Sequence, residues 1–238
     1  MAKKSDLRID WATHASAKYA CDNWHYSGCM PAGKIVKIGA WEYGKFIGVV
    51  LFGRGANNRM SKAYGLNQDQ ACELVRVALT DHEVEVSRIV ALSMRFLKKQ
   101  SNGIKLIVSY ADPKQGHNGG IYQAGNWVYF GKSQAQRELI INGVFTHKRS
   151  ANAKYQTACP EKIMEKTGFD VKWAPVEWKH IYLMPLDEEM RLKINPLSKP
   201  YPKRAQSIDD DAPDIPVGGG RFNSDLCAPL LNNEKNSG

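Results

Sequence analysis

Residues 73–111, ELVRVALTDHEVEVSRIVALSMRFLKKQSNGIKLIVSYA, decide the fold of this chain. The run 73–79 and the run 105–111 are rich in apolar and β-branched residues, and the apolar residues of 86–100 recur at helical spacing. The order strand, helix, strand predicts two parallel strands joined by a right-handed crossover. Ligand-binding groups collect at the carboxyl ends of such strands. We therefore expect the chemistry close to Asp81 and to Asp112.

The sequence around this unit predicts further elements of a mixed sheet. Upstream, the spacing predicts a helix over 11–24 and a hairpin of strands at 34–41 and 46–52. Downstream, it predicts a short helix at 121–125, an antiparallel pair at 127–130 and 139–146, a helix at 160–167 and a strand at 178–184. The expected fold class is α/β (α+β), with a domain over 1–190 and a Pro- and Gly-rich, extended or disordered tail over 191–238.

The amino-acid composition limits which kinds of protein this chain can be. The chain has 238 residues, 43% hydrophobic and 24% charged, which is typical of globular proteins. No apolar run is long enough for a membrane span or a signal peptide, so we expect a cytoplasmic protein that is not bound to a membrane. Five cysteines without a CxxC pair argue against a disulfide framework and a cysteine zinc site. The net charge of +9 favours a polyanionic partner.

Three residues of the strand–helix–strand unit are candidates for chemistry. Asp112 is a carboxylate at a strand end, although Asp before Pro is also a common turn former. Arg76 lies in an otherwise apolar strand, where a buried charge needs an internal partner or a ligand anion. Ser87 stands near the start of the crossover helix, where backbone N–H groups favour phosphate, but nearby carboxylates at 81, 83 and 85 would repel it.

Further candidates lie outside the unit. His25 and Tyr26 could act as an acid/base pair, a stacking platform or metal ligands, or simply pack. Tyr122 could deliver or remove a proton, or be a core aromatic. The basic stretch 147–155 interleaves cations with an aromatic ring, which suits a nucleic-acid backbone and a stacked base or is a solvated charged face; its candidates are Lys148, Arg149, Lys154 and Tyr155.

Several strings together resemble the Mom family of phage DNA-modification proteins. They are HYSG at 25–28, ELVRVALTD at 73–81, SR at 87–88 and SYADPKQGHNGGIYQAGNWVYFG at 109–131. The resemblance runs in order from about Trp24 to about Tyr155. It implies a GNAT-like fold whose sheet splays between two central parallel strands. It also implies conversion of adenine in double-stranded DNA to N6-carbamoylmethyladenine, which shields phage DNA from host restriction.

The resemblance also implies roles for single residues. Asp112, Tyr122 and Tyr26 would be catalytic, Arg76 and Ser87 would bind the donor, and iron would be held by His25, Tyr26 and Asp112. The implied cofactors are iron and acetyl-CoA or another acyl or glycyl donor. However, the glycine pattern with which such enzymes bind coenzyme A is absent between Leu79 and Ser87. The expected partner is double-stranded DNA, and a homodimer is left open.

Two other functions are compatible with these residues. One is a GNAT-like, coenzyme A-dependent acyltransferase acting on an amine of a protein, a small molecule or an aminoacyl-tRNA. The other is a non-catalytic DNA-binding protein, which would explain the charge but would leave Asp112 and Tyr122 without a task.

Overall fold

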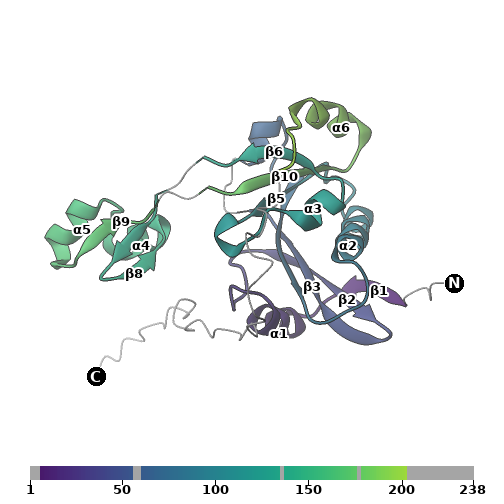
Figure 1. Ribbon diagram of the computed structural model, residues 1–238, viewed down its shortest axis with the longest axis horizontal. Coiled ribbons are helices and arrows are strands. Elements are labelled where there is room, and N and C mark those ends of the chain that lie inside the picture. Colours follow the sequence, from purple (N-terminus) through teal and green to yellow (C-terminus); the bar gives the residue numbers. More distant parts are fainter. Residues whose placement is uncertain (1–5, 56–59, 135–136, 176–177, 203–238) are drawn as a thin grey trace, which may run out of the picture.

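The computed structural model describes residues 6–55, 60–134, 137–175 and 178–202, which form two sheets and their helices (Figure 1). The strands are β1 (Leu7–Trp11), β2 (Ile35–Glu42), β3 (Lys45–Gly53), β4 (Ala71–Leu79), β5 (Leu106–Ala111), β6 (Val128–Lys132), β7 (Leu139–Ile141), β8 (Val144–Thr146), β9 (Val171–Trp173) and β10 (His180–Pro185). The α-helices are α1 (His14–Trp24), α2 (Val86–Gln100), α3 (Gly120–Ala124), α4 (Lys148–Tyr155), α5 (Pro160–Thr167) and α6 (Glu188–Ile194). Short 3-10 helices are η1 (Ser61–Tyr64), η2 (Pro113–Gln115) and η3 (Asn195–Leu197).

The main sheet has seven strands in the order β1-β2-β3-β4-β5-β10-β6. Among the described strands, β4 and β5 are the one parallel pair, and α2 is the crossover between them. The other neighbours in this sheet are antiparallel. The predicted strand–helix–strand unit, the hairpin of β2 and β3 and the mixed α+β class are therefore confirmed.

The two parallel strands lie side by side over only part of their length. Their register runs from Ala71 opposite Leu106 to Leu74 opposite Ser109. Beyond this point β4 runs on to Leu79 alongside β3, while β5 stays paired with β10 as far as Ala111. The centre of the sheet therefore opens toward the carboxyl ends of β4 and β5, as the predicted splay requires.

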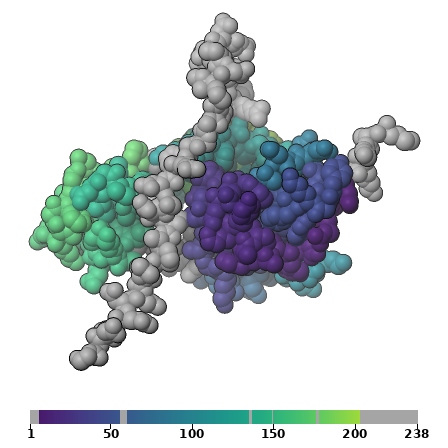
Figure 2. All heavy atoms as spheres, turned by 90° about the horizontal axis from the view of Figure 1, so that it is seen from below, coloured from purple at the N-terminus to yellow at the C-terminus, as the bar shows by residue number. Residues whose placement is uncertain are grey.

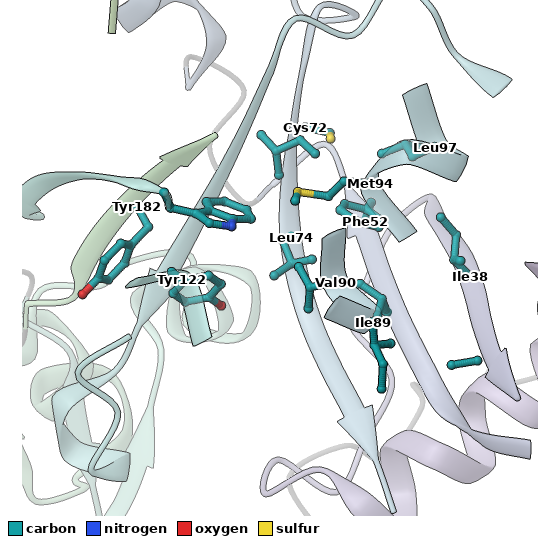
Figure 3. Packing of buried hydrophobic residues seen from close by; sticks show 14 of the residues in the cluster. Ile38, Phe52, Cys72, Leu74, Ile89, Val90, Met94, Leu97, Tyr122 and Tyr182 are labelled. Carbon is teal, nitrogen blue, oxygen red and sulfur yellow. The ribbon is translucent and has the colours of Figure 1, made fainter. Parts of the chain in front are cut away.

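Helices α1 and α2 cover opposite faces of the sheet. The amphipathic helix α2 contributes to the main core, which Figure 3 shows: Ile38, Phe52, Cys72, Leu74, Ile89, Val90, Met94 and Leu97. Helix α1 packs small buried residues, Ala17, Ala20 and Cys21, against the other face. A bulge in the β3–β4 pairing sets Leu74 opposite Phe52 but Arg76 opposite Leu51. Because Phe52 faces α2 and Leu51 faces α1, Arg76 points to the α1 side.

Residues 137–175 form a separate lobe between β6 and β10 (Figure 1). A three-stranded sheet in the order β8-β7-β9 packs with α4 and α5 around its own core of Leu139, Ile141, Ala151, Ile163 and Val171. The predicted pairing of 127–130 with 139–146 is therefore wrong. Asn142 and Gly143 have φ of 49° and 81°, so 139–146 turns back on itself as a tight hairpin. The strand β6 pairs with β10 instead.

The first helix starts later than the sequence predicted, and the last helix extends past the boundary expected at residue 190. Helix α1 begins at His14 because Thr13 caps it, accepting from the N–H of Ser16 at 3.1 Å, and the preceding residues pair with β2 as the strand β1. At the other end, the boundary expected at 190 falls within α6, whose Met190 and Ile194 are buried. The predicted tail lies largely outside the described residues, which end at 202.

Within the described part of the chain, no helix is both long enough and apolar enough to span a membrane.

A buried carboxylate fixes the connection between β4 and α2. Glu42, at the end of β2, is 5% exposed. Its two oxygens accept from the backbone N–H groups of Glu83 at 2.9 Å and of Val84 at 3.0 Å. These bonds hold the start of α2 against the edge of the hairpin, so the position of the helix depends on them.

We predict that Glu42→Ala lowers the free energy of unfolding by about 1–3 kcal/mol, because two buried N–H groups lose their acceptor. Urea denaturation followed by circular dichroism measures the change. Glu83→Ala is the matched control, because this exposed side chain accepts from the hydroxyl of Tyr43 at the surface and its loss should have little effect. Equal stability of Glu42→Ala and wild type would show that water replaces the carboxylate at no cost.

Candidate active site at the separation of β4 and β5

A cavity of about 440 Å³ lies where the two parallel strands separate. It is formed by the start of α2, the end of β5, the loop after η2 and the helix α3. The lining residues are Glu85, Val86, Ser87, Tyr110, Ala111, Gly116, His117, Asn118, Gly119, Gly120, Ile121, Tyr122 and Ala124. Its volume is in the range of small-molecule sites, about 300–1,000 Å³. The cavity therefore holds two of the predicted site residues, Ser87 and Tyr122.

Tyr122 is a buried wall of this cavity. Its hydroxyl oxygen lies 2.7 Å from Ser109 Oγ, which lies 3.0 Å from the carbonyl oxygen of Leu74. A carbonyl oxygen can only accept, so the Ser109 hydroxyl donates its one proton to Leu74. The second bond is then donated by the phenol of Tyr122 to Ser109 Oγ. Burial raises the pKa of Tyr122 to about 12. The phenol is thus protonated near neutral pH and is suited to donate a hydrogen bond rather than to act as a base.

Three aromatic rings come together beside the cavity. The rings of His25 and Tyr26 lie 4.2 Å apart, and Tyr26 meets the ring of His117 edge-on at 5.5 Å. Tyr26 is 54% exposed, and His117 is also exposed while lining the cavity. The end of α1 and the loop after β5, far apart in the sequence, therefore share one aromatic surface at the mouth of the site.

His25 is held in its neutral form. The backbone N–H of Ser27 donates to His25 Nδ1 at 3.1 Å, so the neutral ring carries its proton on Nε2. Burial, and then the charges of Arg76 and His117, lower the pKa of His25 to about 4. A neutral imidazole at pH 7 offers Nε2–H as a donor and leaves no free lone pair on the other nitrogen.

Arg76 is paired inside the protein. Its guanidinium donates to Ser27 Oγ and to the carbonyl oxygen of Cys29, and lies 3.9–4.0 Å from Cys29 Sγ. All these partners lie in the loop after α1. Arg76 is not among the residues that line the described cavity. The arginine therefore holds the loop that carries His25 and Tyr26, which is the internally paired alternative that the sequence left open.

Asp112 ends β5 and lies beside the cavity rather than in its lining. The carboxylate caps η2 by accepting from the N–H of Lys114 at 3.0 Å, and Oδ2 lies 3.4 Å from Lys179 Nζ. Its side chain is 17% exposed. The main-chain carbonyl of Asp112 also accepts from the N–H of His117 at 3.2 Å, so Asp112 shapes the loop that closes the site.

The expected iron site at His25, Tyr26 and Asp112 is wrong. No group of three or more His, Cys, Asp and Glu side chains in the described residues is arranged to hold a metal ion. The His25 Nδ1 lone pair accepts from Ser27, and the carboxylate of Asp112 bonds to Lys114 N–H and Lys179. The nearby charge of Arg76 would also oppose a bound cation.

The predicted DNA-binding residues lie in the inserted lobe and not around the cavity. The stretch 147–155 is not extended but contains the helix α4, with Lys148 Nζ 4.9 Å above the ring of Trp173 and Lys154 Nζ 5.3 Å from that of Tyr155. Tyr155 packs partly into the core of the lobe. The side chain of Arg149 lies outside the described part of the structure. Figure 2 shows the lobe, in green, at one end of the molecule.

His117 is a site residue that the sequence analysis did not select. It lines the described cavity and its ring contacts that of Tyr26. The glycines around it were the available signal, because they mark a sharply turned loop. Gly119 has φ of 84°, and a Cβ there would lie 2.2 Å from the ring of Tyr182.

Comparison with known proteins agrees with the motif resemblance. The profile described as the Mom protein family matches residues 6–203. Methylcarbamoylase mom of Escherichia phage Mu is 23% identical over 152 residues, which cover 62% of this chain and 63% of that protein. The match thus spans less than two thirds of the relative's length. A structure from Acinetobacter baylyi ADP1, provisionally assigned as an acetyltransferase, aligns with a TM-score of 0.41 and 11% identity over 79% of this chain and 96% of its own. Because the family profile covers most of the sequence, this chain belongs to the Mom protein family.

Proposed function

We propose that this chain modifies phage DNA in the cytoplasm of a bacterial host by converting adenine in double-stranded DNA to N6-carbamoylmethyladenine, which protects the DNA from restriction. The observation that carries the proposal is the cavity at the strand separation, because it is built largely from the 109–131 motif on which the family resemblance rests. The membership of the Mom family and the name of the phage Mu relative, a methylcarbamoylase, give the reaction its class.

The reaction requires the target base to leave the helix. Adenine N6 lies within the stacked duplex, so an enzyme that acts on it extrudes the nucleotide and holds the base against aromatic side chains. Tyr26 and His117 offer an exposed pair of rings at the mouth of the cavity. Trp127, by contrast, is 1% exposed and cannot stack on a base from outside. In this proposal the adenine lies against Tyr26 with N6 directed to the end of β5.

The transfer replaces one N6–H bond with a bond from N6 to the methylene carbon of the donor. The proton goes to the carboxylate of Asp112, and the donor's leaving group keeps the electron pair of the bond that breaks. Lys179 Nζ lies 3.4 Å from Asp112 Oδ2 and holds this carboxylate in place at the end of β5. The Tyr122 phenol, bonded to Ser109, forms the wall of the site beside the reacting groups. Ser87 binds the molecule that supplies the carbamoylmethyl group, and Arg76 positions the loop that carries Tyr26.

The inserted lobe supplies the DNA contacts in this proposal. Lys148 and Lys154 lie on one short helix, and Trp173 and Tyr155 lie beneath their ammonium groups. Cations on a helix neutralise backbone phosphates without reading sequence. Tyr155, on the same helix, and Arg149 are the other two predicted DNA-binding residues.

We predict that Asp112→Ala abolishes the modified deoxyadenosine while the domain stays folded, because the proton acceptor is lost. Plasmid DNA co-expressed with the variant is digested to nucleosides and analysed by mass spectrometry, and circular dichroism checks the fold. Asp10→Ala is the matched control, because this half-exposed carboxylate pairs with Arg8 on β1 and its loss should leave the yield unchanged. Full modification by Asp112→Ala would remove Asp112 from the reaction.

We predict that Lys148→Ala/Lys154→Ala weakens binding to duplex DNA and makes its salt dependence shallower. Each lost phosphate contact reduces the slope of log affinity on log salt by about 0.9. Fluorescence anisotropy at several salt concentrations measures both quantities. Lys105→Ala/Lys193→Ala removes the same charge from two lysines that pair with Glu189 in the main domain, so its slope should equal that of wild type. An unchanged slope in the first variant would show that α4 does not contact phosphate.

A further inference from the structure

The turn between β4 and α2 is where the GNAT-like fold implied by the resemblance would hold the pyrophosphate of coenzyme A. Such a site needs backbone N–H groups that point outward at the start of a helix. In this chain the two N–H groups of the turn itself, those of Glu83 and Val84, do not meet that requirement. The N–H groups of Glu83 and Val84 donate inward, at 2.9 Å and 3.0 Å, to the buried carboxylate of Glu42. An internal anion therefore takes the two hydrogen bonds that these groups could otherwise donate to a phosphate.

The charges near the turn also disfavour a phosphate. Asp81, Glu83 and Glu85 lie within five residues of the chain, and Glu85 lines the cavity itself. Among the described lining residues, Glu85 is the one carboxylate and none is lysine or arginine. A pyrophosphate would therefore meet a like charge and lack a cationic partner, an arrangement that costs binding energy in a partly enclosed site.

The same groups are complementary to a neutral amide. Helix α2 begins at Val86, and its first backbone hydrogen bond runs from the N–H of Arg88 to the carbonyl oxygen of Glu85 at 2.9 Å. The N–H groups of Val86 and Ser87 come before this bond. These two N–H groups can donate to a carbonyl oxygen. The carboxylate of Glu85, at the same end of the cavity, can accept from the –NH2 of the amide.

We propose that the cavity binds a small donor with a primary carboxamide and no pyrophosphate, and that Glu42 and Glu85 exclude nucleotide coenzymes from it. This inference rests on the proposed function, because a carbamoylmethyl group ends in a primary carboxamide. The carboxamide lies between Glu85 and the start of α2. Its methylene carbon then points along the cavity toward His117 and the end of β5.

Two probes that differ only in this group test the inference. N-acetylglycinamide ends in a carboxamide and N-acetylglycine in a carboxylate, and amide chemical shifts of the full-length, ¹⁵N-labelled chain report binding of each. We expect N-acetylglycinamide to shift the signals of Val86, Ser87 and Asn118. N-acetylglycine should bind about tenfold more weakly, the loss expected when a hydrogen bond to a charged group is replaced by repulsion. Coenzyme A and inorganic pyrophosphate should leave these signals unchanged.

Two variants show which carboxylate selects the amide. Glu85→Gln should bring the two probes to within about twofold of each other, because glutamine offers both a donor and an acceptor. Glu83→Gln is the matched control and should keep the preference, since Glu83 bonds to Tyr43 and does not line the cavity. In Glu42→Ala, pyrophosphate should shift the amide signals of Glu83 and Val84, because these N–H groups are no longer bonded to the carboxylate. Binding of coenzyme A to the wild-type cavity would overturn the inference.

Equal affinity of wild type for the two probes, or no shift with either, would also overturn it. Binding of the two probes is measured without DNA, so this result can be obtained whether or not the protein modifies DNA. Absence of modified deoxyadenosine would overturn the proposed DNA modification and leave the carboxamide inference standing. A preference of the cavity for coenzyme A or for N-acetylglycine would overturn the carboxamide inference and leave the DNA modification standing.

Discussion

The separation of β4 from β5 beyond Leu74 and Ser109 is the constraint on which the rest of the structure depends. Two strands that part inside a sheet leave backbone groups that need other partners. Ser109 meets part of this need, because its hydroxyl bridges to the carbonyl of Leu74 across the last paired position. Tyr122 then bonds to Ser109, and its ring packs against Trp127 and Tyr182 at 5.0 Å from each. The cavity is therefore the space that this chain of contacts keeps open.

The parting of the strands also decides which side chains meet. The loop after β5 turns away from β4, and its left-handed glycines bring His117 toward the end of α1. From the opposite side, the bulge in β3–β4 turns Arg76 toward the same helix end, where it binds the loop through Ser27 and Cys29. The separation of β4 from β5 and the bulge between β3 and β4 thus both bring side chains to the loop after α1. A regular sheet of the same sequence would leave Arg76 facing the apolar side of α2.

Periodicity was sufficient to predict the elements that carry the fold, but not their partners. The residues 86–100 have a strong helical pattern and a strand on each side, so the parallel pair followed from local order alone. The pairing of β6 depends on β10, which lies about fifty residues later, and no local pattern contains that information. The site shows the same limit. Asp112 and Tyr122 could be selected by their place after a strand, whereas the roles of Glu42 and His117 arise from contacts across the fold.

Acidic and basic side chains lie in different parts of the protein. The net charge of +9 indicated a polyanionic partner, yet the cavity at the strand separation is lined by Glu85 and has Asp112 beside it. Lysines on α4 and their aromatic neighbours lie instead in the inserted lobe. A basic cavity would attract the phosphates of any nucleic acid and would be filled by its backbone. In the function proposed above, cations on a separate lobe would bind the DNA backbone while the cavity stays open to one base and a neutral donor.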